Sequence, residues 1–138
     1  MTLLDAYALM AFLVGGPAAS QVRSLLHEGD IGLTTANLIE VLDVSERVRA
    51  LPISRAIEIL EPLFEGTLVA MSLDLGVARR AAEIRARHYH RATRPISLAD
   101  AVLVAAANPG DRIATSDPDI LVVAKEERID TVRLPEQG

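Results

Sequence analysis

The 138-residue sequence has no cysteine, no tryptophan and a single lysine, Lys125, and only 3% of its residues are aromatic. The absence of cysteine excludes disulfide bonds, thiolate zinc sites and cysteine nucleophiles, and it suits a reducing compartment such as the cytoplasm. The scarcity of aromatic residues leaves few rings on which nucleic-acid bases could stack. It also predicts a core of aliphatic side chains, since half of the sequence is hydrophobic.

The sequence also lacks an apolar run long enough to cross a bilayer, which takes about 18 residues. Its first twenty residues contain a short apolar stretch, but this stretch is interrupted by Asp5 and has no basic residues before it. A secretory signal peptide begins with a basic segment. We therefore expect a cytoplasmic protein without a membrane segment.

Several common site motifs are missing as well. There is no G-x-G-x-x-G motif for a dinucleotide, no G-x-x-x-x-G-K-[ST] loop for a nucleoside triphosphate and no H-E-x-x-H zinc motif. His88 and His90 are two residues apart and would lie on different faces of a helix, which disfavours zinc. A phosphatase of the haloacid-dehalogenase type would need an acid two residues after Asp5, where Tyr7 stands.

What is present is an alternation of short apolar segments with longer segments of helical periodicity. We expect strands at residues 2–4, 31–34, 67–71, 112–115 and 131–134, separated by helices. Strands joined through long helices pair in parallel by right-handed crossovers. The sequence therefore predicts one α/β domain over residues 1–138, a three-layer α/β/α sandwich with a central parallel sheet.

Capping and breaking residues set the expected helix boundaries. Pro17 is expected to begin the second helix, and Thr35 to cap a helix that continues to about Arg49. Pro62 should kink or break the following helix, which starts at residue 53 or 54. A long helix is expected from residue 74 to about residue 90.

Two acids lie in apolar surroundings in the first third of the chain. Asp5 ends a buried strand, where a carboxylate is costly unless it is paired or bound to metal, although it could also cap the next helix. Glu40 is flanked by apolar residues on a helix whose solvent-exposed edge could also account for it. Asp43, one turn later, could join Glu40 in a cluster.

Two further acids begin helices in the last third. Asp100 stands three residues after Ser97, which is the spacing of a capping box, but it could face a cleft at the same time. Asp117 and Pro118 form a good N-cap and N1 pair. Asp119 is an alternative or additional metal ligand, and the choice between Asp117 and Asp119 stays open at this point.

The predicted topology brings all of these acids to one edge of the sheet, because the carboxyl ends of parallel strands lie together. Four carboxylates there repel one another, and the sequence offers no lysine close to them. An all-oxygen cluster without basic partners suits a hard divalent cation, Mg²⁺ or Mn²⁺. We therefore expect a metal site at that edge.

The net charge of −5 is unusual for a protein that binds nucleic acid, but the charge is unevenly distributed. The segment RARHYHRATR (Arg85–Arg94) holds four arginines, two histidines and no acid. This basic strip is a candidate for binding an RNA backbone. It could equally be the solvated C-terminal end of a helix, where cations are favoured.

Four motifs, in this order and spacing, resemble the PIN-domain family and within it the VapC-type toxins: LLDAYALMAFL, NLIEVLDV, SLADAVLVAAA and IATSDPDI. The resemblance covers essentially the whole chain. It implies that Asp5, Glu40, Asp100 and Asp117 form an acidic quartet that holds Mg²⁺ or Mn²⁺. Asp119 matches the family pattern less well.

The resemblance also implies an activity and partners. The expected reaction is the cleavage of RNA by a metal-activated water, and the expected role is that of the toxin in a toxin–antitoxin pair. The chain would form a homodimer and bind a VapB-type antitoxin whose C-terminal segment crosses the active site. The alternative is a PIN fold that no longer cleaves RNA and serves only to bind an antitoxin or RNA.

Overall fold

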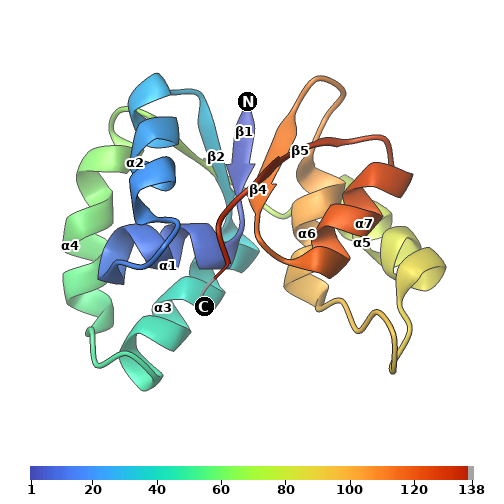
Figure 1. Cartoon of the computed structure of the whole chain (residues 1–138), viewed down its shortest axis with the longest axis horizontal. Helices are drawn as coiled ribbons and strands as arrows, with labels where there is room; N and C mark the ends of the chain where they lie inside the picture. The colour runs from blue at the N-terminus through green and yellow to red at the C-terminus, as the bar shows by residue number, and fades with distance from the viewer. Residues whose placement is uncertain (137–138) are drawn as a thin grey trace.

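The computed structural model describes residues 1–136, within which the chain forms five strands and seven helices (Figure 1). The strands are β1 (Thr2–Leu4), β2 (Ile31–Thr34), β3 (Leu68–Met71), β4 (Arg112–Thr115) and β5 (Asp130–Arg133). The helices are α1 (Ala6–Val14), α2 (Ala19–Glu28), α3 (Thr35–Arg47), α4 (Ile53–Phe64), α5 (Leu75–His88), α6 (Leu98–Ala106) and α7 (Pro118–Glu126).

The strands form one sheet in the order β3-β2-β1-β4-β5, and every neighbouring pair is parallel. The chain adds β2 and β3 on one side of β1 and then adds β4 and β5 on the other. The order therefore reverses between β1 and β4. In open parallel sheets, this reversal opens a crevice at the carboxyl ends of the two strands, where ligands bind.

Helices cover both faces of the sheet, which confirms the predicted α/β/α sandwich (Figure 1). Alternate residues of the central strand point to opposite faces. Leu4 packs with residues of α1, α2 and α4, whereas Leu3 packs with residues of α5, α6 and α7. Helix α3 contacts α1 and α6 and so joins the two helical layers.

Some expected helix boundaries are wrong, each for a local reason. Helix α2 begins at Ala19 and not at Pro17, because Gly15 and Gly16 have positive φ values and Pro17 still belongs to the turn. The cap of α3 is Thr34 and not Thr35, since the Thr34 hydroxyl accepts the N–H of Asn37 at 3.0 Å.

The remaining differences are at the ends of elements. Helix α3 ends at Arg47 and α5 at His88, each two residues before the expected end. Strand β5 starts and ends one residue earlier than expected. Pro62 does not break α4, which continues for two residues beyond it.

Within residues 1–136, no single helix has the length and apolar character to cross a membrane. Helices α1 and α2 pass that test of length and composition only when taken together, and they are bent by 103° relative to each other.

Candidate active site

The acids that the sequence singled out lie around the point where the strand order reverses. Asp5 directly follows β1, and Asp117 comes two residues after β4, the strand beside it. The backbone N–H of Asp5 donates to the carbonyl of Ala114 in β4 at 3.3 Å. This hydrogen bond joins the ends of β1 and β4 close to the residues that carry the two carboxylates.

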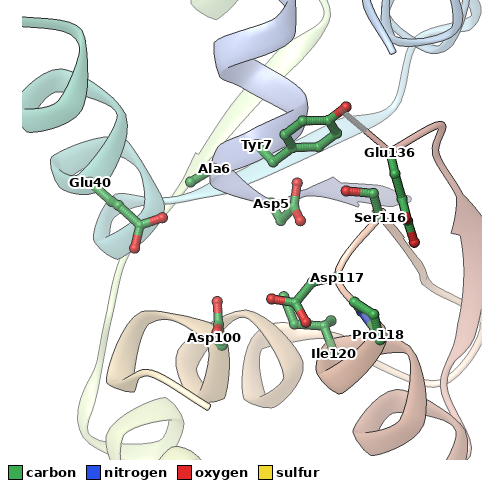
Figure 2. Close-up of a pocket in the computed structure, with 10 residues that line it drawn as sticks. All are labelled: Asp5, Ala6, Tyr7, Glu40, Asp100, Ser116, Asp117, Pro118, Ile120 and Glu136. Atoms are coloured by element: carbon green, nitrogen blue, oxygen red, sulfur yellow. The ribbon is translucent and has the colours of Figure 1, made fainter. Parts of the chain in front are cut away.

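A cavity of about 390 Å³ opens at this place. Asp5, Glu40, Asp100 and Asp117 all line it, and Figure 2 shows their carboxyl groups pointing toward a common space. The other lining residues are Ala6, Tyr7, Ser116, Pro118, Ile120 and Glu136. The lining thus contains five carboxylates and no lysine, arginine or histidine.

Asp5 is the most deeply placed of these acids, with a relative exposure of 4%. One of its oxygens accepts the N–H of Ala8 at 2.8 Å, which caps α1, and the other accepts the hydroxyl of Thr115 at 2.5 Å. Burial raises the pKa of Asp5 to about 6, the two hydrogen bonds oppose this rise, and the charges of Asp100 and Asp117 add to it. Capping and site formation therefore coexist at this residue.

Thr115 connects two of the acids. Its hydroxyl donates to Asp5 and accepts the backbone N–H of Asp117 at 3.0 Å, and the residue is fully buried. A hydroxyl can do both because it carries one donor and two acceptor positions. The Asp5 carboxylate and the start of α7 are therefore fixed relative to each other by one buried side chain.

Glu40 reaches the cavity from the other side, on α3 (Figure 2). It is partly buried, and its pKa is raised by burial and by the negative charge of Asp100. Asp43 does not join it, contrary to the expectation from the sequence. It is exposed and forms a two-bond ion pair with Arg47, one turn further along α3.

Asp100 occupies the first turn of α6 and completes the capping box expected from its spacing. Its backbone N–H donates to the Ser97 hydroxyl at 3.0 Å, while its carboxylate accepts the Ser97 N–H at 3.3 Å. Burial raises the pKa of Asp100, the bonds to Ser97 lower it, and the charges of Asp117 and Asp119 raise it further. The capping box thus holds this carboxylate at the edge of the cavity.

Asp117 and Asp119 occupy different positions. Asp117 lines the cavity and caps α7, where its carboxylate accepts the N–H of Asp119 at 2.8 Å. Asp119 lies one residue into the helix after Pro118 and is not among the lining residues. Although Asp119 does not line the cavity, its negative charge contributes to the raised pKa of Asp100.

Tyr7 and Glu136 are polar lining residues that were not predicted as site residues. The Tyr7 hydroxyl donates to the carbonyl of Pro135 at 2.7 Å, which holds the segment after β5 beside the cavity and brings Glu136 to it. The partners of this hydrogen bond are 128 residues apart in sequence. No local pattern could have indicated the contact.

The donor set fits a hard divalent cation in its chemistry, because the polar side chains that line the cavity are five carboxylates and the hydroxyl-bearing side chains of Tyr7 and Ser116. Burial and, to a smaller extent, the charges of neighbouring acids raise the pKa values of Asp5, Glu40 and Asp100. Within residues 1–136, however, no three histidine or acidic side chains are close enough together to hold a metal ion. The carboxylates surround an open cavity, and they would have to approach one another to share an ion.

Two of the four arginines in the basic strip Arg85–Arg94, and His88, contact acids from the end of α7 and the residue after it. Arg87 and His88 contact Glu127 at 2.7 Å, while His88 and Arg94 approach Glu126 at 3.0 and 3.7 Å. Arg85 to His88 form the last turn of α5, as expected for cations at a helix end. Most of the strip therefore has a structural role.

The sequence matches the family model for the PIN domain over residues 2–126. A comparison with curated protein sequences finds no match.

Solved structures with the same fold include three complexes. FitAcB from Neisseria gonorrhoeae is 23% identical, with a TM-score of 0.67, and the match covers 96% of this chain and 97% of that one. DNA-bound VapBC from Salmonella typhimurium is 17% identical, with a TM-score of 0.64 and 96% of both chains covered. A toxin–antitoxin complex from Klebsiella pneumoniae is 15% identical, with a TM-score of 0.62 and 85% and 87% covered. At these identities the likeness establishes the fold.

Proposed function

Because this chain belongs to the PIN-domain family, we propose that it is a metal-dependent endoribonuclease and the toxin of a VapBC-type toxin–antitoxin pair. One observation carries the proposal. Four carboxylates, those of Asp5, Glu40, Asp100 and Asp117, line one cavity at the switch point of the sheet, and no basic side chain lines it with them. Such a cluster is stabilised by binding cations and disfavoured without them.

The four acids would hold Mg²⁺ or Mn²⁺, with Asp119 as a further negative charge behind them. Asp5 would be a metal ligand of fixed orientation, because each of its carboxylate oxygens already accepts a hydrogen bond that holds the side chain in place. Thr115 positions Asp5, and the Ser97 capping box positions Asp100. Within residues 1–136, no hydrogen bond holds the Glu40 side chain, which comes from α3 on the other side of the cavity, so Glu40 is the ligand best able to move toward an ion.

When bound, such an ion lowers the pKa of water and neutralises negative charge on the phosphate under attack. The nucleophile is then water and not the 2′-hydroxyl of the RNA. We therefore expect products with a 5′-phosphate and a 3′-hydroxyl. A cyclic phosphate product, or activity that persists in EDTA, contradicts the proposal.

The proposed partners are a VapB-type antitoxin and a second copy of the chain, both in the cytoplasm. Large exposed apolar side chains that neighbour the acids in the sequence support a protein partner. Ile39 precedes Glu40 and is 70% exposed, and Leu98 stands two residues before Asp100 and is 69% exposed. Exposed apolar side chains are buried when a partner protein covers them.

The alternative function is a PIN-fold module that binds an antitoxin or RNA without cleaving it. The two functions differ in what the acids do. In a nuclease, replacing Asp100 by Asn removes both metal affinity and cleavage, whereas a module without a metal site shows neither in the first place. The clustering of four carboxylates at one cavity favours the nuclease, since a module gains nothing from bringing these acids together.

The test uses purified protein, a labelled single-stranded RNA, and Mg²⁺ or EDTA. We expect Mg²⁺-dependent cleavage that falls by about 100-fold or more in Asp100→Asn. Asp43→Asn is the matched control, because Asp43 is an acid on the same helix as Glu40 that pairs with Arg47 outside the cavity. Equal losses in the two variants, or no cleavage by the unmodified protein with any divalent cation, contradict the proposed function.

A further inference from the structure

A second large hollow, of about 710 Å³, lies between the end of α7 and strand β5. Leu121 and Lys125 line it from α7, where their spacing of four residues places them on one side of the helix, and Arg128 lines it from the turn after α7. Thr131 and Arg133 line it from β5, and alternate residues of a strand share a face. We call this hollow the α7–β5 groove; Ile129 and Asp130 complete its lining.

The groove is the opposite of the acidic cavity in charge. It contains the only lysine of the sequence and two arginines, against one acid, Asp130. Among residues 1–136, no salt bridge is found for Lys125 or Arg128. Arg133 has one weak contact at 3.6 Å with Glu136, and both side chains are at least 60% exposed. Such exposed ion pairs contribute little to stability, so a phosphate group could replace Glu136 as the partner of Arg133.

Shared lining residues relate the groove to the acidic cavity through one intermediate hollow. Arg133 lines both the groove and a neighbouring hollow of about 520 Å³, and Glu136 lines both that hollow and the acidic cavity. Figure 1 shows β5 beside α7 and the chain after β5 passing across the molecule toward α1, where Tyr7 holds Pro135. A strand of RNA in the cavity could thus continue along β5 into basic surroundings.

We propose that the α7–β5 groove binds the phosphate backbone of the RNA whose scissile bond lies in the acidic cavity. This inference rests on the proposed function. Phosphates are the ligand that this lining fits, since it contains three cationic residues and no aromatic side chain that could stack on bases. β5 is an edge strand, so backbone groups on its outer side are not used by the sheet and can also face the ligand.

The basic strip Arg85–Arg94 is a poorer candidate for this role, because Glu126 and Glu127 already contact Arg87, His88 and Arg94. Within residues 1–136, Lys125 and Arg128 of the groove form no salt bridge, and Arg133 has only its contact with Glu136. Contacts to phosphates carry no base information. The groove is therefore expected to give affinity and a strong salt dependence with little sequence preference.

The experiment neutralises the groove in one variant, Lys125→Gln, Arg128→Gly and Arg133→Gln. Glycine is chosen at position 128 because Arg128 has a φ of +62°, which glycine adopts without strain, so the variant should fold. The control variant neutralises three other exposed arginines by the changes Arg47→Gln, Arg55→Gln and Arg79→Gln. Each of these already pairs with an acid on its own helix. Both variants lower the net charge by three, so only the location differs.

Affinity for a fluorescein-labelled single-stranded RNA is measured by anisotropy with Mg²⁺, in an Asp100→Asn background that prevents cleavage. We expect the groove variant to lose tenfold or more in affinity at 0.1 M salt. Its plot of log affinity against log salt concentration should be shallower by about 2, as for three lost phosphate contacts on a single strand. The control variant should stay within threefold and keep its slope.

An equal loss in the two variants overturns the proposal, since net charge alone would then explain it. Unchanged RNA binding by the groove variant overturns it as well, and loss of antitoxin binding in its place would assign the groove to a protein. A dinucleotide-length substrate separates this inference from the proposed function. With Asp100 intact, the groove variant should cleave it as fast as the unmodified protein, because so short a substrate fills only the acidic cavity. If the unmodified protein cleaves no RNA, the proposed function fails while the binding result still stands.

Discussion

Replacing Asp5 by Asn should make the metal-free protein more stable at neutral pH, although Asp5 makes two hydrogen bonds. Burial keeps the pKa of Asp5 at about 6, compared with its ordinary value of 3.8. Ionising this carboxyl at pH 7.5 therefore costs the folded protein about 3 kcal/mol. The single side-chain oxygen of Asn can accept a hydrogen bond from either the Ala8 N–H or the Thr115 hydroxyl, and its NH₂ group has no acceptor beside it. This loss reduces the gain in stability by about 1–2 kcal/mol. We expect a net gain of about 1–2 kcal/mol.

The pH dependence of folding stability provides an independent test of the sign of this effect. Below about pH 4 the Asp5 carboxyl is protonated in both the folded and the unfolded chain, so the folded state carries no cost. As the pH rises from about 4 to 6, the unfolded chain loses its proton first and the stability of the folded protein falls. Asp5→Asn should remove most of this decline. Glu40 and Asp100, whose pKa values are also raised, should leave a smaller decline of the same sign.

The assay is urea unfolding followed by circular dichroism at several pH values, in EDTA and again with Mg²⁺. Metal that binds only the folded state stabilises it by about 2.7 kcal/mol at a concentration of 100 times its Kd. Mg²⁺ should therefore stabilise the unmodified protein much more than Asp5→Asn and reverse their order. If the variant is the less stable protein in EDTA at pH 7.5, or if Mg²⁺ stabilises both proteins equally, the reasoning about an uncompensated carboxylate is wrong.

Three further predictions concern the side chains around the acids. Thr115→Val removes the hydroxyl that bridges the ends of β1 and β4; cleavage should fall at least tenfold in kcat with little change in KM, and an unchanged kcat contradicts this positioning role. Ser97→Ala removes the capping box that holds Asp100, so the free energy of unfolding measured in urea should fall by about 1 kcal/mol. Metal affinity measured by calorimetry should fall as well. A loss of stability with unchanged metal affinity would show that Ser97 only caps the helix. Asp117→Asn should weaken Mn²⁺ binding more than Asp119→Asn, since only the first of these acids lines the cavity; the reverse order would make Asp119 the direct ligand.

The parts of the site that follow from local chemistry were predictable from the sequence. The prediction that Asp117 caps a helix and Pro118 begins it uses only the preferences of these two residue types, and the structure has both features. The same holds for Ser97 and Asp100. The meeting of these acids with Asp5 follows from parallel pairing, which puts all strand ends at one edge of the sheet.

Tertiary contacts decided what the sequence could not reveal. Helical spacing places Asp43 one turn from Glu40, but the arginine four residues further along draws it away from the cavity. The basic strip contains no acid within its own segment, and the glutamates that contact it come from more than 30 residues later. The contact between Tyr7 and Pro135 joins opposite ends of the chain. No pattern within one helix or strand contains such information.

The central claim is that Asp5, Glu40, Asp100 and Asp117 together hold a divalent cation. A crystal structure of the protein with Mn²⁺, with an anomalous difference map recorded for manganese, tests it most directly. We predict a manganese peak in the acidic cavity with oxygens of at least three of these four carboxylates as ligands, drawn closer together than in the metal-free arrangement. A map without a peak in this cavity at saturating Mn²⁺, or with a peak bound by other residues, would contradict the account.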